Sequence, residues 1–289
     1  MSSIQNSHDH IGPLTPATST QVHQQPSPSM VFLLASGAAF SVASLYYSQP
    51  MLGILATDIG VSNVAIGYVP TLTQLGYALG ILLLAPLGDK HDRRNIILIK
   101  AGLLVAALLA AAASQSLGVL LVASLAIGLT ATMAQDIVPA AATLAHESRR
   151  GKVVGSVMTG LLMGILLSRV VSGFVAEQFG WRSMFVLAAL GVSLIGVAIW
   201  RGLPHFVPTT SMSYRALLGS LFDLVRRHGK LRRAALAQGL IQITDRITAG
   251  VAAKFLDEQG MTACFAGNRA GHLELVRWAA RFGERRFAV

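Results

Sequence analysis

Two ionisable side chains, Arg169 and Asp136, stand inside long apolar stretches of this sequence. Arg169 lies in the segment GILLSRVVSG, whose other residues are all small or apolar. A guanidinium group offers a planar fork of hydrogen-bond donors that suits a carboxylate or carbonyl group. A carboxyl group shielded from water, as expected for Asp136, could take up and release a proton near neutral pH. We therefore expect ligand binding at Arg169 and proton transfer at Asp136.

The elements that must position these groups follow from the uneven distribution of charge. Only 12% of the 289 residues are charged and 53% are hydrophobic, whereas soluble domains carry about 25% charged residues. A membrane-spanning helix needs about 20 mostly apolar residues. The runs without Asp, Glu, Lys or Arg are long enough for such helices and comprise residues 10–57, 59–88, 101–135 and 183–200. The sequence thus predicts an all-α, polytopic membrane protein.

Residues 30–201 are predicted to form a six-span helical bundle. The expected spans are residues 30–55, 64–87, 96–113, 117–144, 153–179 and 183–200. Basic residues in short loops mark the cytoplasmic side. One side holds only Arg182, and the other side holds Lys90, Arg93, Arg94, Arg149, Arg150 and Lys152. The amino terminus is therefore expected in the cytoplasm.

The segments that flank this bundle are polar or mixed in composition. Residues 1–29 lack Lys and Arg and are rich in Ser, Thr, Pro, Gln and His, which predicts a disordered cytoplasmic tail rather than a signal peptide. Residues 202–230 are predicted to form a basic cytoplasmic loop. Within this loop, helical spacing places five apolar side chains on one face of an amphipathic helix at the membrane surface, namely Leu217, Leu218, Leu221, Leu224 and Val225. A partly helical linker is the alternative.

Three stretches carry a resemblance to a known family. They are YYSQPMLGILATDIGVS, VPTLTQLGYALGILLLAPLGDKHDRRNIIL and QDIVPAAATLAHESRRGKVVGSVMTGLLMGILLSRVVSGFVAEQFGWRSMF. In this order they resemble the amino-terminal half of the major facilitator superfamily, in particular its bacterial drug:proton antiporter and sugar-efflux branch. The second stretch resembles the cytoplasmic signature of the family through Asp89, Lys90, Arg93 and Arg94, although Ala85 and Asp92 replace glycines of the pattern.

The resemblance implies a multi-pass inner-membrane transporter that exports a small organic solute, drug-like or sugar-like, by proton antiport. Such transporters combine two six-span halves and bind their ligands between the halves. The expected partners are the lipid bilayer, the solute and protons. The signature loop is expected to latch the two halves, with a role in setting topology as the alternative.

Depth along the spans gives a list of candidate pathway residues. At a rise of about 1.5 Å per residue, Arg169 lies level with Tyr47 and Gln49, and Asp136 lies level with Gln74. The depth difference between Arg169 and Asp136 is roughly 13 Å on this count, which argues against a direct ion pair. The predicted substrate and proton pathway comprises Asp136, Arg169, Gln49, Tyr46, Tyr47 and Gln74. Outward snorkelling of Arg169 and a hydrogen-bonded structural role for Asp136 are the alternatives.

Other function classes fit the sequence poorly. The net charge of +10 sits in short segments between apolar runs, so nucleic-acid binding is not expected. The single cysteine, Cys264, provides no metal-ligand spacing. No phosphate-binding loop, nucleophile elbow or zinc-binding helix is present in the sequence, so neither an enzyme nor a cofactor is expected.

The resemblance is expected to end near Gly239, where the composition changes. Residues 231–250 begin as an incomplete seventh span that then acquires charges, and residues 251–289 are rich in Arg and Gly. We interpret this change as the result of a frameshift in an interrupted transporter gene, in which case another reading frame would continue the seventh span. The alternatives are a six-span protein with a soluble tail, in which two copies pair, and a non-transporting membrane protein that is either a degraded product or an interaction module.

Overall fold

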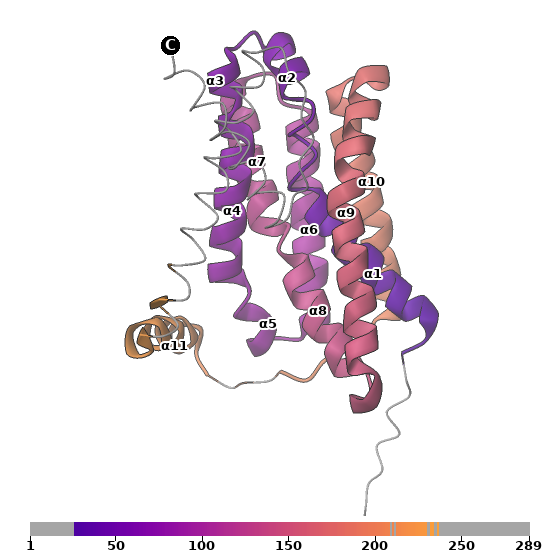
Figure 1. Cartoon of the computed structure of the whole chain (residues 1–289), viewed down its shortest axis with the longest axis vertical. Coiled ribbons are helices and arrows are strands. Elements are labelled where there is room, and N and C mark those ends of the chain that lie inside the picture. The colour runs from indigo at the N-terminus through magenta and orange to yellow at the C-terminus, as the bar shows by residue number, and fades with distance from the viewer. Residues whose placement is uncertain (1–25, 209, 211, 230–231, 234–235, 237–289) are drawn as a thin grey trace, which may run out of the picture. The chain divides into compact units, whose positions relative to one another are not determined.

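Every regular element of the described chain is a helix (Figure 1). A computed structural model describes residues 26–208, 210, 212–229, 232–233 and 236. Within these residues, five segments are long and apolar enough to cross a membrane, namely Asn63–Lys90, Arg93–Ala112, Leu117–Leu144, Glu147–Phe179 and Trp181–Gly202. The prediction of an all-α membrane protein is confirmed. Most of the predicted tail 1–29 and of the incomplete seventh span 231–250 lies outside the described residues, as does the whole of segment 251–289.

The first predicted span is not one continuous helix. Helix α1 (Pro28–Ala43) has 16 residues and is followed by turns up to α2 (Leu52–Ile59). The backbone N–H groups of Leu45, Tyr46 and Gln49 each bind the carbonyl three residues back, so the turn is tighter than an α-helix. Pro50 has no N–H to donate, which helps to prevent a longer helix. The expected six long spans therefore become five long segments and one shorter apolar helix.

The second and third spans lie on either side of the signature loop, residues 88–94. The second span consists of α3 (Asn63–Ile66), α4 (Tyr68–Leu84) and α5 (Leu87–Lys90). The third span is α6 (Arg93–Ala112). Asp92 caps α6, because its Oδ1 accepts a hydrogen bond from the backbone N–H of Arg94 at 3.0 Å.

The fourth span is interrupted between α7 (Leu117–Thr130) and α8 (Met133–Leu144). Ser41 of α1 satisfies backbone groups at this break: its hydroxyl donates to the carbonyl of Ala131 at 2.6 Å and accepts from the N–H of Ala134 at 3.3 Å. Such bonds are needed because hydrocarbon offers no water to unpaired backbone groups. A short 3-10 turn, η1 (Glu147–Arg149), leads to α9 (Arg150–Phe179) and then to α10 (Trp181–Gly202).

Glycines allow two pairs of helices to pack with their backbones in close approach. A Cβ atom on Gly76 of α4 would lie 2.2 Å from the carbonyl oxygen of Leu125 on α7. A Cβ atom on Gly164 of α9 would lie 2.5 Å from the carbonyl oxygen of Ala39 on α1. Figure 1 shows α9 crossing α1 and α4 running beside α7. These contacts are the small-residue packing typical of membrane helices.

The segment after α10 contains the helix α11 (Tyr214–Arg227). Its bounds fall within the loop for which the sequence predicts an amphipathic helix. From Arg215 to its end, α11 belongs to a unit distinct from the bundle.

Candidate functional site

The guanidinium group of Arg169 lies over the aromatic ring of Tyr46. Its central carbon is 5.6 Å from the ring centroid, within range of a cation–π interaction. Arg169 is exposed on α9, and Tyr46 is half-buried in the turn after α1. Arg169 therefore lies beside Tyr46, another residue of the predicted pathway, and its donors are not buried in the protein core.

Two further polar side chains, Tyr77 and Gln135, adjoin this pair. The side-chain amide of Gln135 on α8 donates a hydrogen bond to the hydroxyl of Tyr77 on α4 at 2.9 Å. The phenol groups of Tyr46 and Tyr77 also interact electrostatically. Arg169, Tyr46, Tyr77 and Gln135 are hereafter the polar cluster, which is built by α4, α8, α9 and the turn after α1.

Sequence reasoning missed both Tyr77 and Gln135. Gln135 precedes Asp136, which drew attention as the only charged residue of its span. Tyr77 lies three residues after the predicted Gln74 on α4. Gln74 and Gln49 are both half-buried, the former on α4 and the latter in the turn that also holds Tyr46. A helical-wheel comparison of Gln74 with Tyr77 could have found the second residue.

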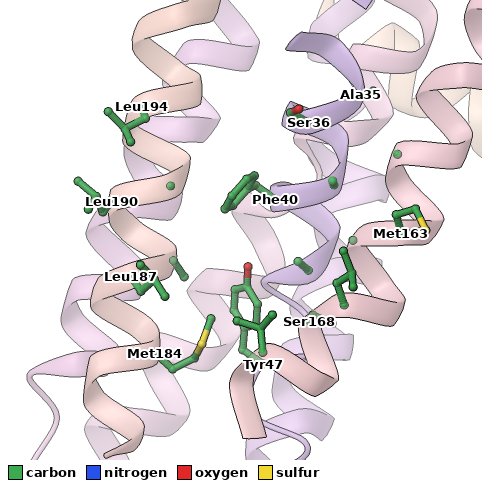
Figure 2. Close-up of a pocket in the computed structure, with 18 of the residues that line it drawn as sticks. Ala35, Ser36, Phe40, Tyr47, Met163, Ser168, Met184, Leu187, Leu190 and Leu194 are labelled. Carbon is green, nitrogen blue, oxygen red and sulfur yellow. The ribbon is translucent and has the colours of Figure 1, made fainter. Parts of the chain in front are cut away.

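Tyr47 points away from the polar cluster. It is 4% exposed and lines a cavity of about 740 Å³ between α1, α9 and α10. Figure 2 shows its ring directed into this cavity, near Ser168 and Met184. The remaining wall is almost entirely apolar, as the labelled Phe40 and Leu190 illustrate. Neighbouring residues project to different sides, so the two tyrosines of the predicted pathway lie apart: Tyr46 contacts Arg169, whereas Tyr47 lines this cavity.

Asp136 forms a buried ion pair with Lys100 of α6. Lys100 Nζ lies 2.6 Å from Asp136 Oδ2, and the two side chains are 4% and 3% exposed. At this separation the attraction is about 6 kcal/mol for an effective dielectric constant of about 20. This attraction opposes the cost of removing both charges from water. The partner of Asp136 in the structure is therefore Lys100, whereas Arg169 contacts Tyr46.

Lys100 was overlooked in the sequence, because it lies inside the predicted third span but outside the charge-free run 101–135. The sequence spacing of Lys100 from Arg93 does indicate its role. Lys100 follows Arg93 by seven residues, which places both side chains on one face of α6. Arg93 also interacts electrostatically with Asp136. Two cations at heptad spacing on a membrane helix thus point toward one buried carboxylate.

Asp136 also lies against the signature loop. A Cβ atom on Gly88 would be 2.4 Å from Asp136 Oδ1, so only glycine leaves room for the carboxylate there. Asp89 binds Arg93, with 3.0 Å between Oδ1 and Nη2. Lys90 is half-buried at the end of α5. Asp136 therefore sits between the signature loop and Lys100, and its side chain is buried.

The other end of the signature loop is bound to the segment that follows α10. The carboxylate of Asp92 contacts the ring of His205 and accepts from the backbone N–H of Phe206 at 3.0 Å. Arg94 Nη1 lies 2.8 Å from His205 Nε2 and also binds the carbonyl of Trp200. Burial acts to raise the pKa of Asp92, but the bonds from Phe206, His205 and Arg94 hold this pKa below its usual range.

A second ionic group, the Asp58 cluster, joins α2 to the start of α10. Asp58 Oδ2 accepts hydrogen bonds from Arg182 at 2.6 Å and from the indole of Trp181 at 3.0 Å. Arg182 also binds the carbonyl of Ser114 at 3.1 Å and stacks 4.2 Å from the ring of Trp181. The hydrogen bonds from Arg182 and then from Trp181 lower the pKa of Asp58. The basic residue that the sequence places alone on its side of the membrane is thus paired.

Residues 34–267 match the Major Facilitator Superfamily. The chain belongs to this superfamily. It is similar to the uncharacterized transporter YgaY of Escherichia coli O157:H7, with 42% identity over 217 residues that cover 75% of this chain and 55% of YgaY. It is also similar to the Streptomyces coelicolor transporter SCO4007, with 34% identity over 222 residues that cover 71% of this chain and 48% of that protein. The chain spans about half the length of these curated relatives.

Solved structures of two transporters share this fold. A peptide transporter POT in complex with alafosfalin superposes with a TM-score of 0.56 at 16% identity, over 82% of this chain and 53% of that one. The inward-open xylose transporter XylE of E. coli gives a TM-score of 0.51 at 18% identity, over 75% of this chain and 56% of that one. Both likenesses show the fold alone.

Membership of the Major Facilitator Superfamily confirms the family predicted from the sequence and places the chain among membrane proteins. The match continues past Gly239, where the resemblance was expected to end, to residue 267. The drug:proton antiporter and sugar-efflux branch stays a prediction.

Proposed function

We propose that this chain forms the amino-terminal half of a secondary transporter that exports a small organic solute, drug-like or sugar-like, from a bacterial cell by proton antiport. The observation that carries the proposal is the polar cluster, in which three helices and the turn after α1 present Arg169, Tyr46, Tyr77 and Gln135. Substrate sites of such transporters lie between two halves near the midplane of the membrane. The polar cluster is the part of the described bundle whose chemistry best suits such a site.

The chemistry of the polar cluster favours a solute with hydroxyl groups and a carboxylate or carbonyl group. Gln135 offers both an amide donor and an amide acceptor, and Tyr77 offers a hydroxyl group. Arg169 could exchange its contact with the ring of Tyr46 for a bidentate bond to a carboxylate. The freed tyrosine ring would then be available to stack on an apolar face of the solute.

Proton coupling requires a group that changes its protonation during the cycle, and Asp136 is our candidate. Its neighbours make this role testable: protonation would leave the Lys100 ammonium without its counter-charge, directly beside Gly88 of the signature loop. A proton on Asp136 could thereby alter the loop that is expected to latch the two halves. The amino terminus of the intact transporter would lie in the cytoplasm, and the membrane would be the inner membrane.

Substrate-dependent proton flux into vesicles tests the proposal. The full chain would be reconstituted with a pH gradient, and a panel of drugs, sugars and sugar acids would be added while a pH-sensitive dye is followed. The expected result is flux in the wild type, loss of flux in R169Q and Y77F, and retention of flux in R201Q. Arg201 is a matched control because it is an exposed arginine near the end of α10, outside the polar cluster.

The competing function is a non-transporting membrane protein, either the degraded product of an interrupted gene or an interaction module. The observation that favours it is the match to only about half the length of the relatives. An absence of flux for every solute would support this alternative for the chain by itself. If flux appears, cross-linking would show whether two copies pair to complete the transporter.

A further inference from the structure

The segment that carries α11 concentrates much of the positive charge of the protein. Residues 201–233 contain one acidic residue, Asp223, and seven basic ones, namely Arg201, Arg215, Arg226, Arg227, Lys230, Arg232 and Arg233. This difference of +6 belongs to a total of +10. Such an excess in a membrane protein needs a negative partner or a strongly solvated surface.

The helix α11 also has an apolar face. Leu217 and Leu224 are seven residues apart and lie on the same side of the helix, while Leu218 is rotated by about 100° from Leu217 and widens this apolar face. Leu217 and Leu218 are half-buried, and Leu224 is 46% exposed. A helix with leucines on one face and arginines beside them is the pattern of an interfacial amphipathic helix.

The arginines of α11 fall into two groups. Arg227 is paired with Asp223, with 3.8 Å between Nη2 and Oδ2. Arg215 and Arg226 are exposed, and neither forms an ion pair within the described part of the chain. They are eleven residues apart, which corresponds to about three turns and about 16 Å along one flank of the helix. Two unpaired cations on one flank can reach two separate anionic groups.

We propose that α11 binds the anionic phospholipids of the membrane that holds the bundle. Arg215 and Arg226 contact the phosphates of anionic headgroups, while Leu217, Leu218 and Leu224 enter the boundary between headgroups and acyl chains. The cytoplasmic leaflet is anionic and attracts basic segments next to a transmembrane bundle. This inference goes beyond the proposed function and does not depend on transport.

The test measures how far α11 inserts into bilayers of different charge. The full chain, with Cys264 replaced in C264S, would carry a spin label at L218C on the apolar face or at A216C on the opposite face. The variants would be placed in nanodiscs of phosphatidylcholine alone or of three parts phosphatidylcholine to one part phosphatidylglycerol. Accessibility of the label to a water-soluble nickel reagent would be measured at 0.15 M and 1 M salt, where the Debye length is about 8 and 3 Å.

We expect the label at L218C to be shielded only in the anionic bilayer at the lower salt concentration, and the label at A216C to remain accessible throughout. Equal accessibility of L218C in both bilayers would overturn the proposal. Equal shielding in both bilayers would overturn it as well, because α11 would then pack on protein or insert without help from headgroup charge.

Matched double variants test the assignment to individual arginines. R215Q/R226Q removes the two unpaired cations, whereas D223N/R227Q removes an ion pair without changing the net charge. Each basic residue near an anionic surface strengthens membrane binding by about fivefold. Losing two of them in R215Q/R226Q should therefore lower the ratio of inserted to free helix by about 25-fold. D223N/R227Q should leave this ratio within about twofold of the wild type. Equal losses in the two variants would refute the role of Arg215 and Arg226.

Discussion

Replacing Lys100 by methionine is expected to destabilise the bundle severely, because Asp136 would keep its burial and lose its counter-charge. Both side chains are at most 4% exposed, so water cannot replace the missing partner without opening the contact between α6 and α8. Removing one partner of such a pair typically costs about 3–5 kcal/mol of folding free energy. D136N should cost a similar amount, since it leaves the ammonium of Lys100 unpaired.

The double variant K100M/D136N distinguishes the energetic contribution of the two charges from the contribution of the packing of their side chains. Methionine and asparagine roughly retain the shapes, and neither leaves a buried charge behind. Replacing a buried pair by uncharged groups is often nearly neutral. The double variant should therefore be more stable than either single variant, with a coupling free energy of at least about 2 kcal/mol.

The assay is equilibrium unfolding of the four proteins in mixed micelles with increasing SDS, followed by circular dichroism. Additive losses in the double variant would refute the reasoning, because they would show that the two charges act independently. The same variants sharpen the transport test. Loss of coupling in both D136N and K100M/D136N, with membrane insertion intact, would support a protonation role for Asp136, whereas unchanged coupling would exclude it.

Two further predictions concern the packing and the pH dependence of the bundle. G164A should destabilise the contact of α9 with α1 by about 1–3 kcal/mol, because its new Cβ would lie 2.5 Å from the carbonyl oxygen of Ala39. The control G155A, whose new Cβ meets nothing within 4 Å, should be neutral or stabilising. SDS unfolding measures both variants. The folded-state pKa of Asp58 lies below its unfolded value of about 3.9, so the stabilisation from the Asp58 cluster is present above about pH 4 and is lost as the pH falls through the folded-state pKa. The emission of Trp181, studied as the sole tryptophan, should report this loss on acidification, and D58N should already show the acid spectrum at pH 7; an acid-induced change that persists in D58N would contradict the assignment.

Much of the architecture could be predicted from local composition. The apolar runs indicate helices of membrane-spanning length, because a lipid environment permits few other ways to satisfy the backbone. The spacing Gly160-x-x-x-Gly164 indicates close helix packing, and a Cβ atom on either residue would meet α1. The similar spacing Gly151-x-x-x-Gly155 does not correspond to packing, because a Cβ atom on either residue meets nothing within 4 Å. A glycine spacing shows that close helix packing is possible, but the fold decides whether another helix packs against it.

The candidate site was less predictable, because it depends on the directions in which side chains point and not only on their depth in the membrane. Counting residues placed Arg169 beside the stretch that contains Tyr46, since rise along a helix is nearly constant. The same count could not separate Tyr46 from Tyr47, because depth along a span does not report direction and consecutive residues point to different sides. It also could not pair Gln135 with Tyr77, which are 58 residues apart in the chain.

The sequence by itself determined that this is an all-helical membrane protein of the Major Facilitator Superfamily, because hydrophobic length and motif order are local properties. Only the tertiary structure decided the partners of the charged groups. A buried charge binds whichever opposite charge the packing brings within a few ångströms, and three-dimensional packing placed Lys100 at Asp136 and Asp58 at Arg182. The break in the first span was likewise a structural outcome, since the apolar run continues through a turn that only backbone hydrogen bonding and packing define.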